Sequence, residues 1–353
     1  MSDGAMTKVS NKPQLASVTA GKRYAWCKCG KSQRQPFCDG SHKGTNIEPV
    51  VFTAKASEDL LLCGCKHTQN PPFCDGSHNN LEDEYAIASQ AEIAETKNAL
   101  HVPRENGAYG KSELDGGAYV VTPDPTAMMQ KDKLSWQSLI GRADGARNLD
   151  LIRFTTNGTT PWRTYKGGDT VLYVVAGRGA INIEGKRFNV SPETGIYVRM
   201  GEAFRLEAIE DLDVMAAVSP EAEPAAWPEK AAGSFTAEHA ERCVGVDVTA
   251  REKMADRFYQ VLIDGNVGSA DVTQFIGEIP QSRAAFHRHL YEEAIVILSG
   301  AGTMWTRARK TSVATGDVIY LPPRQEHSLE CTASEGMRLM GVFYPSGSPA
   351  INY

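Results

Sequence analysis

The residues best suited to chemistry are cysteines and histidines that recur early in the chain. Six of the eight cysteines precede residue 80, within the phrases "CKCGKSQRQPFCDGSH" at 27–42 and "CGCKHTQNPPFCDGSH" at 63–78. Each donor recurs 36 residues later, which indicates a duplicated structural unit. Three thiolates and one imidazole suit either zinc or a [2Fe–2S] cluster. The candidate ligands are Cys27, Cys29, Cys38 and His42, repeated as Cys63, Cys65, Cys74 and His78.

The spacing within each phrase predicts a local geometry. Cys27 and Cys29 are two apart, so on an extended segment their side chains leave the same side. Cys38 and His42 are four apart, which we expect to bring them together on one helical turn, with Asp39 capping it. So small a region must rely on its metals to fold.

Both phrases resemble the full signature of the CDGSH iron–sulfur (NEET) family, over residues 15–82. The resemblance implies one [2Fe–2S] cluster per motif, ligated by three cysteines and one histidine. It is also similar to tandem members in which one polypeptide does the work of a homodimer. Two purely structural zinc knuckles are the alternative.

A second constellation lies near the C-terminus, in "HRHLYEEAIVILSG" and the residues after it. His287 and His289 are two apart on a predicted strand and therefore point the same way. Glu293 keeps that parity, and His327 arrives from a separate strand after a turn at Pro322.

This pattern resembles both halves of the cupin signature. The resemblance implies a jelly-roll barrel that binds one mononuclear divalent metal through His287, His289, Glu293 and His327. Iron is the first expectation, and Mn, Ni, Cu and Zn stay open. Glu293 is either a ligand or a base, and Tyr291 and Arg283 are candidates for substrate contact. The family's second motif usually ends in Asn where this chain has a cysteine, which we expect to be a packed strand residue: Cys331.

A degenerate copy precedes this one. Aligning Gly177 with Gly300 gives an offset of 123 residues and leaves no metal ligand in the earlier copy. The chain thus resembles a bicupin with a structural first barrel. The positions matched to His287, His289, Glu293 and His327 are Thr164, Lys166, Thr170 and Leu206.

Short alternating apolar runs separated by Gly, Pro and Asp predict a mainly β protein. We expect a tandem CDGSH domain and two cupin barrels. The predicted bounds are 15–82 for the CDGSH domain, 83–112 for a linker with one short helix, 113–220 for the degenerate N-terminal cupin and 234–353 for the metal-binding C-terminal cupin.

Composition excludes several other classes of protein. The 353-residue chain has a formal net charge of −6 and no basic stripe, which argues against a nucleic-acid partner. No apolar run is long enough to span a bilayer, so we expect no membrane partner. The N-terminal residues lack the apolar segment of a secretory signal, so a cytoplasmic location is expected.

Together these features favour a redox enzyme. The expectation is a non-haem, iron-dependent oxygenase that acts on a small organic molecule with O₂, while the clusters supply electrons received from a reductase or ferredoxin. Self-association through the barrels is left open. Two alternatives remain: a non-redox decarboxylase, isomerase or aminohydrolase using Mn or Zn and regulated by the clusters, and a non-catalytic iron–sulfur sensor or transfer protein.

Overall fold

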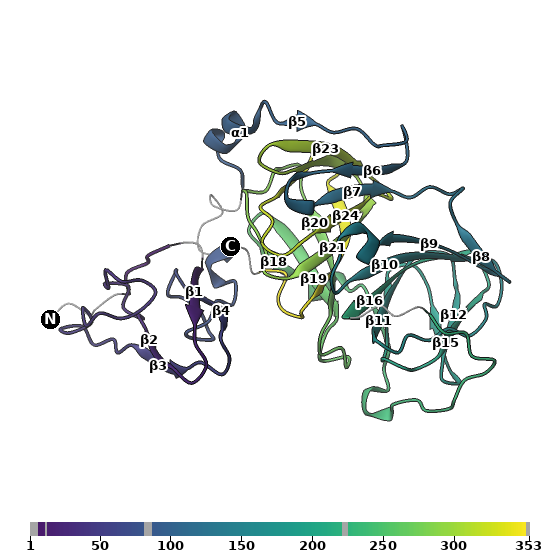
Figure 1. Cartoon of the computed structure of the whole chain (residues 1–353), viewed down its shortest axis with the longest axis horizontal. Helices are drawn as coiled ribbons and strands as arrows, with labels where there is room; N and C mark the ends of the chain where they lie inside the picture. The colour runs from purple at the N-terminus through teal and green to yellow at the C-terminus, as the bar shows by residue number, and fades with distance from the viewer. Residues whose placement is uncertain (1–5, 11–12, 81–86, 221–224, 351–353) are drawn as a thin grey trace. The chain divides into compact units, whose positions relative to one another are not determined.

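The chain folds into two compact units made mainly of β-strands (Figure 1). The computed structural model describes residues 6–10, 13–80, 87–220 and 225–350. One unit comprises residues 1–89 with 348–353, and the other comprises residues 90–347. Within the described ranges there is one α-helix, α1 (Gln90–Thr96), and no helix has the length and apolar character needed to cross a bilayer.

The first unit interlocks the two copies of the repeat. Its strands are β1 (Gln14–Val18), β2 (Arg23–Trp26), β3 (Val50–Thr53) and β4 (Glu58–Leu62). The first strand of each copy pairs with the second strand of the other: β1 with β4, and β2 with β3. The two copies therefore share one core, in which Trp26 and Leu62 occupy equivalent buried positions.

The second unit contains two sandwiches of β-sheets, which confirms the predicted pair of cupin-like barrels. The first has a seven-stranded and a three-stranded sheet. In sheet order its strands are β17 (Cys243–Gly245), β14 (Thr194–Val198), β11 (Gly168–Ala176), β16 (Leu212–Pro220), β10 (Asp150–Thr156), β9 (Leu134–Ile140) and β8 (Met129–Lys131), then β13 (Lys186–Val190), β12 (Gly179–Ile183) and β15 (Phe204–Ala208).

The second barrel has an eight-stranded and a four-stranded sheet. In sheet order its strands are β18 (Glu252–Met254), β19 (Arg257–Ile263), β20 (Thr273–Ile279), β26 (Met337–Tyr344), β21 (Glu292–Ser299), β24 (Val318–Leu321), β7 (Tyr119–Thr122) and β6 (Gly110–Glu113), then β25 (Ser328–Cys331), β22 (Ala301–Trp305), β23 (Arg309–Ala314) and β5 (Leu100–His101).

The barrels exchange strands, so the structure differs from the predicted boundaries. Strand β7 was expected in the first barrel but pairs with β24 of the second, while β17 pairs with β14 of the first. The predicted linker 83–112 also contributes to the second barrel, through β5 and β6. Arg104 fixes it there with an ion pair of 2.9 Å to Asp317. Such long-range pairing leaves no local mark in the sequence.

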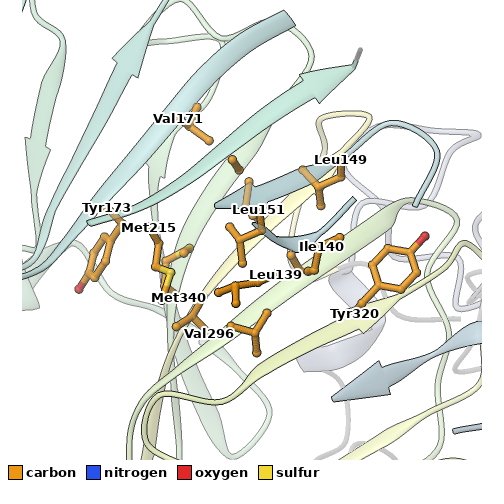
Figure 2. Close-up of a cluster of buried hydrophobic side chains, with 14 of the residues drawn as sticks. Leu139, Ile140, Leu149, Leu151, Val171, Tyr173, Met215, Val296, Tyr320 and Met340 are labelled. Carbon is orange, nitrogen blue, oxygen red and sulfur yellow. The ribbon is translucent and has the colours of Figure 1, made fainter. Parts of the chain in front are cut away.

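The two large sheets enclose an apolar layer between the barrels (Figure 2). Strand β11 shows why its sequence is apolar almost throughout. Val171 and Tyr173 face this layer, whereas Leu172 and Val174 fill the interior of the first barrel. A strand buried on both faces has no position for an alternating polar residue.

Side chains of strand β21 also alternate between the layer and a barrel interior, but here the interior position is a carboxylic acid. Ala294 and Val296 lie in the layer between the barrels. Because side chains alternate along a strand, Glu293 faces the interior of the second barrel. This carboxylate is only 3 % exposed.

Candidate functional site

In the first unit the two copies position their donors with the same hydrogen bonds. The Cys27 amide donates to the Pro36 carbonyl and the Cys63 amide to the Pro72 carbonyl, each at 2.9 Å. The Ser32 hydroxyl bonds the Phe37 carbonyl, as the Thr68 hydroxyl bonds that of Phe73. Because these contacts recur at one offset, both donor sets stand on the same backbone frame. The amides of the third cysteines are fixed likewise, Cys38 on Ala25 and Cys74 on Leu61.

The eight donors form four close pairs. The sulfur–sulfur distances are 3.7 Å for Cys27–Cys29 and 3.4 Å for Cys63–Cys65. The sulfur to Nδ1 distances are 3.1 Å for Cys38–His42 and 3.3 Å for Cys74–His78. Among the described residues, the group of three donors that converges closely enough for a metal lies in the second barrel and includes none of these eight. Each copy thus presents its donors as two close pairs.

The local conformation differs from the expected one. The cysteine pairs follow strands β2 and β4 in bends, rather than lying in extended segments. Between Cys38 and His42 the chain is not helical, because Gly40 has φ of 95°, and Gly76 has φ of 85° in the second copy. The left-handed glycine turns the histidine back to its cysteine. Asp39 accepts from the Ser41 amide at 3.0 Å, which closes a local turn in place of the predicted helix cap.

One residue in this unit was missed by sequence reasoning. The buried Lys66 donates to the Cys63 carbonyl at 3.1 Å and to Gln35 of the other copy at 3.0 Å. Burial lowers the pKa of Lys66. A hydrogen bond with Cys65 lowers the pKa of the Cys63 thiol to about 6. Comparing the two copies does not reveal Lys66, because the equivalent residue of the first copy is Gly30.

In the second barrel three of the four predicted metal ligands converge. The donor nitrogens of His287, His289 and His327 all lie within 4.8 Å of one another. His287 and His289 lie in an extended segment just before β21 instead of in a regular strand, and His327 directly precedes β25. The backbones of His287 and His327 exchange two hydrogen bonds, of 3.1 and 2.9 Å, which hold their rings close together, with centroids 4.4 Å apart and planes tilted by 59°.

The histidines present a defined nitrogen to the centre of the triad. Nδ1 of His287 is 2.8 Å from the Ala285 carbonyl, and Nδ1 of His327 is 2.9 Å from the Gln325 carbonyl. A carbonyl accepts only from a protonated nitrogen, so Nε2 keeps its lone pair free for a metal. Burial also lowers the pKa of His327 to about 4.

Glu293 and Tyr291 flank His289. Oε2 of Glu293 lies 3.5 Å from Nε2 of His289 and has no hydrogen-bond partner. Burial raises the pKa of this carboxyl to about 8. The Tyr291 ring stacks on His289 at 4.5 Å and on Phe343 at 4.0 Å. The phenol therefore fixes the plane of the imidazole.

Two arginines border this site in different ways. Arg283 stacks on Trp305 and donates to the hydroxyls of Ser328 and Thr96, joining helix α1 to the barrel wall. Its contact with substrate stays a prediction. Arg257, which sequence reasoning missed, is buried, and its Nη2 has no hydrogen-bond partner. The pKa of His287 is lowered mainly by burial, then by the charges of His327 and His289, and to a smaller extent by the charge of Arg257.

Among its described residues the first barrel has no counterpart of this triad, and the predicted alignment needs correction. Arg163 and Phe204 exchange two backbone hydrogen bonds of 2.8 Å, as His287 and His327 do. Arg163 and Tyr165 thus occupy the histidine positions, where we had placed Thr164 and Lys166, and Phe204 replaces the predicted Leu206. Thr170 does match Glu293, since their partners on β14 and β24 are Val198 and Leu321.

Comparison with known proteins agrees with both sites. The family described as iron-binding zinc finger CDGSH type matches residues 2–43 and 46–79, and the cupin domain family matches residues 278–343. The chain carries a tandem CDGSH region and a C-terminal cupin. The cupin match includes all four predicted ligands, whereas the first barrel is recognised by its structure alone.

The curated relatives match the CDGSH region. The chain is 49 % identical over 45 residues to human "CDGSH iron-sulfur domain-containing protein 3, mitochondrial", covering 12 % of this chain and 35 % of that one. The mouse protein of the same name is 47 % identical over 56 residues, covering 15 % and 41 %. The chain therefore spans less than half the length of these two relatives.

Solved structures match the two barrels. E. coli protein Ylba superposes with a TM-score of 0.51 at 17 % identity, covering 66 % of this chain and 93 % of that one. Oxalate decarboxylase from Bacillus subtilis superposes with a TM-score of 0.50 at 14 % identity, covering 64 % and 76 %. At such identities the likeness establishes the fold of a bicupin.

Proposed function

We propose that the protein is an oxidoreductase in which the C-terminal cupin holds a divalent metal, iron first, and oxidises a small organic molecule with O₂. In this proposal the CDGSH region holds two [2Fe–2S] clusters that supply electrons. The observation that carries it is the buried convergence of His287, His289 and His327 in the same chain as two iron-binding motifs.

The donor set fits a metal of this class. Three converging imidazoles, two of which keep the Nε2 lone pair available, and one adjacent carboxyl group suit Fe, Mn, Ni, Cu or Zn. The orphaned Oε2 of Glu293 is a buried acceptor that a cation would satisfy. A metal bound there would supply a Lewis-acidic centre with positions for substrate and, if it is iron, a redox-active one.

Residues around the triad hold the imidazoles in place and could contact the substrate. The backbone pairing of His287 with His327 and the stacking of Tyr291 on His289 hold the imidazoles in place. The unpartnered Nη2 of Arg257 offers a donor to an anionic group on the substrate. The stacked rings of Tyr291 and Phe343 shield His289 from water.

The donor pairs of the CDGSH region support clusters over zinc. A single tetrahedral zinc draws four donors together, whereas a [2Fe–2S] cluster has two irons with two protein ligands each. Each motif presents its donors as two pairs, of which the Cys63–Cys65 pair is one.

The test is anaerobic purification of the full chain with iron, sulfide and trace-metal analysis, followed by O₂ uptake with small aromatic, keto and amino acids. A Cys38→Ser, Cys74→Ser variant should keep the barrel metal. It should turn over poorly with a protein electron donor and recover with a small-molecule reductant. Manganese or zinc in the barrel with no O₂ uptake would instead favour the non-redox enzyme, and full turnover in the variant would reassign the clusters to sensing.

A further inference from the structure

The interior of the first barrel contains a buried arginine that takes the place of a metal ligand. Arg163 occupies the position that His287 has in the second barrel, and it is only 6 % exposed. Tyr165, the counterpart of His289, lies beside it on the same face of the segment and is 3 % exposed. A position that supplies an imidazole of the histidine triad in one barrel thus carries a fixed positive charge in the other.

The guanidinium of Arg163 has no counter-ion among the described residues. Its Nε and Nη1 and the hydroxyl of Tyr165 are buried without a well-formed hydrogen bond, and the polar group that interacts with the guanidinium is the uncharged phenol of Tyr165. Burial lowers the pKa of Arg163 and raises that of Tyr165 to about 12, so near neutral pH the phenol keeps its proton. Buried donors without acceptors cost free energy, and a buried charge without a partner costs more.

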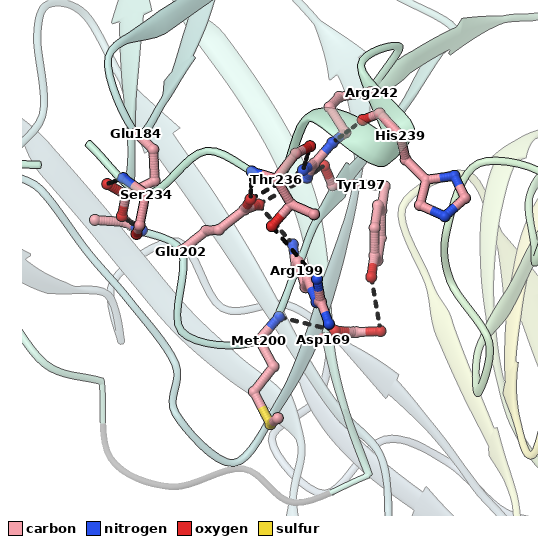
Figure 3. Close-up of polar contacts among 11 residues, drawn as sticks. Asp169, Glu184, Tyr197, Arg199, Met200, Glu202, Ser234, Thr236, His239 and Arg242 are labelled. Atoms are coloured by element: carbon pink, nitrogen blue, oxygen red, sulfur yellow. Dashed lines mark hydrogen bonds and ion pairs between the residues drawn. The ribbon is translucent and has the colours of Figure 1, made fainter. Parts of the chain in front are cut away.

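A second buried arginine of the same barrel shows how such a charge is ordinarily satisfied (Figure 3). Arg242 forms two hydrogen bonds with the Glu202 carboxylate, of 2.7 and 2.9 Å. It also donates to the carbonyls of His239 and Thr236. Arg163 has no carboxylate or carbonyl acceptor of this kind, so a bound anion could satisfy its N–H groups.

Aromatic rings surround Arg163 and offer no acceptor to its Nε and Nη1. The guanidinium carbon lies 5.4 Å from the centroid of Trp136, 4.9 Å from Phe154, 5.1 Å from Tyr165 and 4.8 Å from Trp227. Rings attract a cation electrostatically but cannot accept the in-plane hydrogen bonds of its fork. Trp136 and Trp227 are half-buried, so this box extends towards the solvent.

We propose that the first barrel binds a small carboxylate, with the Arg163 guanidinium and the Tyr165 hydroxyl as its donors and the aromatic box as its walls. A planar monoanion matches a planar fork and flat rings, and one guanidinium neutralises its single charge. A phosphate dianion would bring more charge and more acceptors than these two side chains satisfy. This site needs no metal and does not depend on the proposed oxidation.

The experiment is calorimetric titration of the full chain with formate, acetate and benzoate, against sodium chloride at equal ionic strength. Quenching of tryptophan fluorescence is a second readout, because Trp136 and Trp227 are part of the box. We expect saturable binding of at least one carboxylate. Arg163→Met should weaken it about 100-fold or more, since two charge-assisted hydrogen bonds are lost. Tyr165→Phe should weaken it about 3- to 10-fold.

Controls separate this site from the rest of the chain. Arg205→Met, a change at a more exposed arginine of the same barrel, and His289→Ala, in the other barrel, should both keep the binding. Arg163→Met should fold, because an apolar side chain of similar length replaces an unpaired buried charge. Arg163→Lys keeps the charge without the fork and should also bind weakly.

Three results would overturn the proposal. One is an absence of carboxylate binding to the full chain. Another is binding that His289→Ala removes and Arg163→Met keeps, which would place the carboxylate in the second barrel. The third is binding that appears only after Glu221 and Glu223, which lie outside the described residues, are changed to Gln, because an internal carboxylate would then be the counter-ion.

Discussion

The two barrels share one backbone frame and differ in what that frame points inward. At equivalent places the first barrel pairs Arg163 with Phe204, and the second pairs His287 with His327. The first interior is otherwise lined mainly by apolar side chains, whereas the second contains three imidazoles and the carboxyl group of Glu293. The comparison teaches that hydrogen-bond register can persist while the side chains at the same positions change from converging imidazoles to aromatic rings around one cation.

The largest effect we predict comes from an equivalent pair of core leucines. Leu206 pairs with Ile181 in the first barrel, and Leu329 pairs with Met304 in the second. Changing either to Ala removes a buried side chain and should lower the free energy of unfolding by about 2–5 kcal/mol. Only Leu329→Ala, two residues from His327, should also weaken metal binding. Denaturant titration and metal titration of both variants check this, and weaker metal binding in Leu206→Ala would show that the barrels are not independent.

A smaller effect is expected at the wall of the second barrel. Arg283→Met loses hydrogen bonds to Ser328 and Thr96, so the free energy of unfolding should fall by about 1–3 kcal/mol. The equivalent residue of the first barrel is Thr159, which is exposed and forms the matching bridge to Glu207. Thr159→Ala should change stability by less than about 0.5 kcal/mol. Equal losses in the two variants in thermal unfolding would contradict the proposed role of Arg283.

The smallest effect is a pH dependence at Asp150, the first residue of β10 in the first barrel. Burial raises the pKa of Asp150 from 3.8 to about 6, with Arg142 opposing and Glu292 adding to the shift. Between these values the folded chain holds a proton that the unfolded chain has lost, so this carboxyl's contribution to stability falls as pH rises. Asp150→Asn should remove that slope between pH 4 and 6.

Asp124→Asn is the control for this pH dependence. Hydrogen bonds from Thr126 lower the pKa of Asp124, so it titrates below the window and its variant should keep the slope. Thermal unfolding from pH 4 to 7 measures both variants. An unchanged slope in Asp150→Asn would show that another group causes it.

Much of the site was predictable because its signals are local. The eight CDGSH donors and the three converging histidines lie within short phrases of fixed spacing. The exchange of β7 and β17 between barrels was not, because strand pairing over long separations leaves no pattern in either segment. The corrected alignment of Arg163 has a similar reason. Equivalent residues of the two barrels are 124 positions apart before β11, as for Arg163 and His287, but 123 apart within it, as for Thr170 and Glu293. The first barrel therefore has one extra residue between these positions, which an alignment at a constant offset of 123 misses.

The Arg257 side chain shows a different limit. The residues next to Arg257 in the sequence form no recognisable binding or catalytic motif. Only the fold brings Arg257 close enough to act on the pKa of His287. Lys66 is similar, because its partner Gln35 belongs to the other copy of the repeat. Both are single polar side chains whose role depends on burial.

The account's central claim is that the second barrel binds metal and the first does not. The most direct measurement is the metal content of the full chain after desalting, by mass spectrometry, with sulfide analysis to subtract cluster iron. The account predicts one further divalent metal per chain, lost in His289→Ala and kept in Tyr165→Phe, the equivalent position. Metal retained by His289→Ala, or lost from Tyr165→Phe, would contradict it.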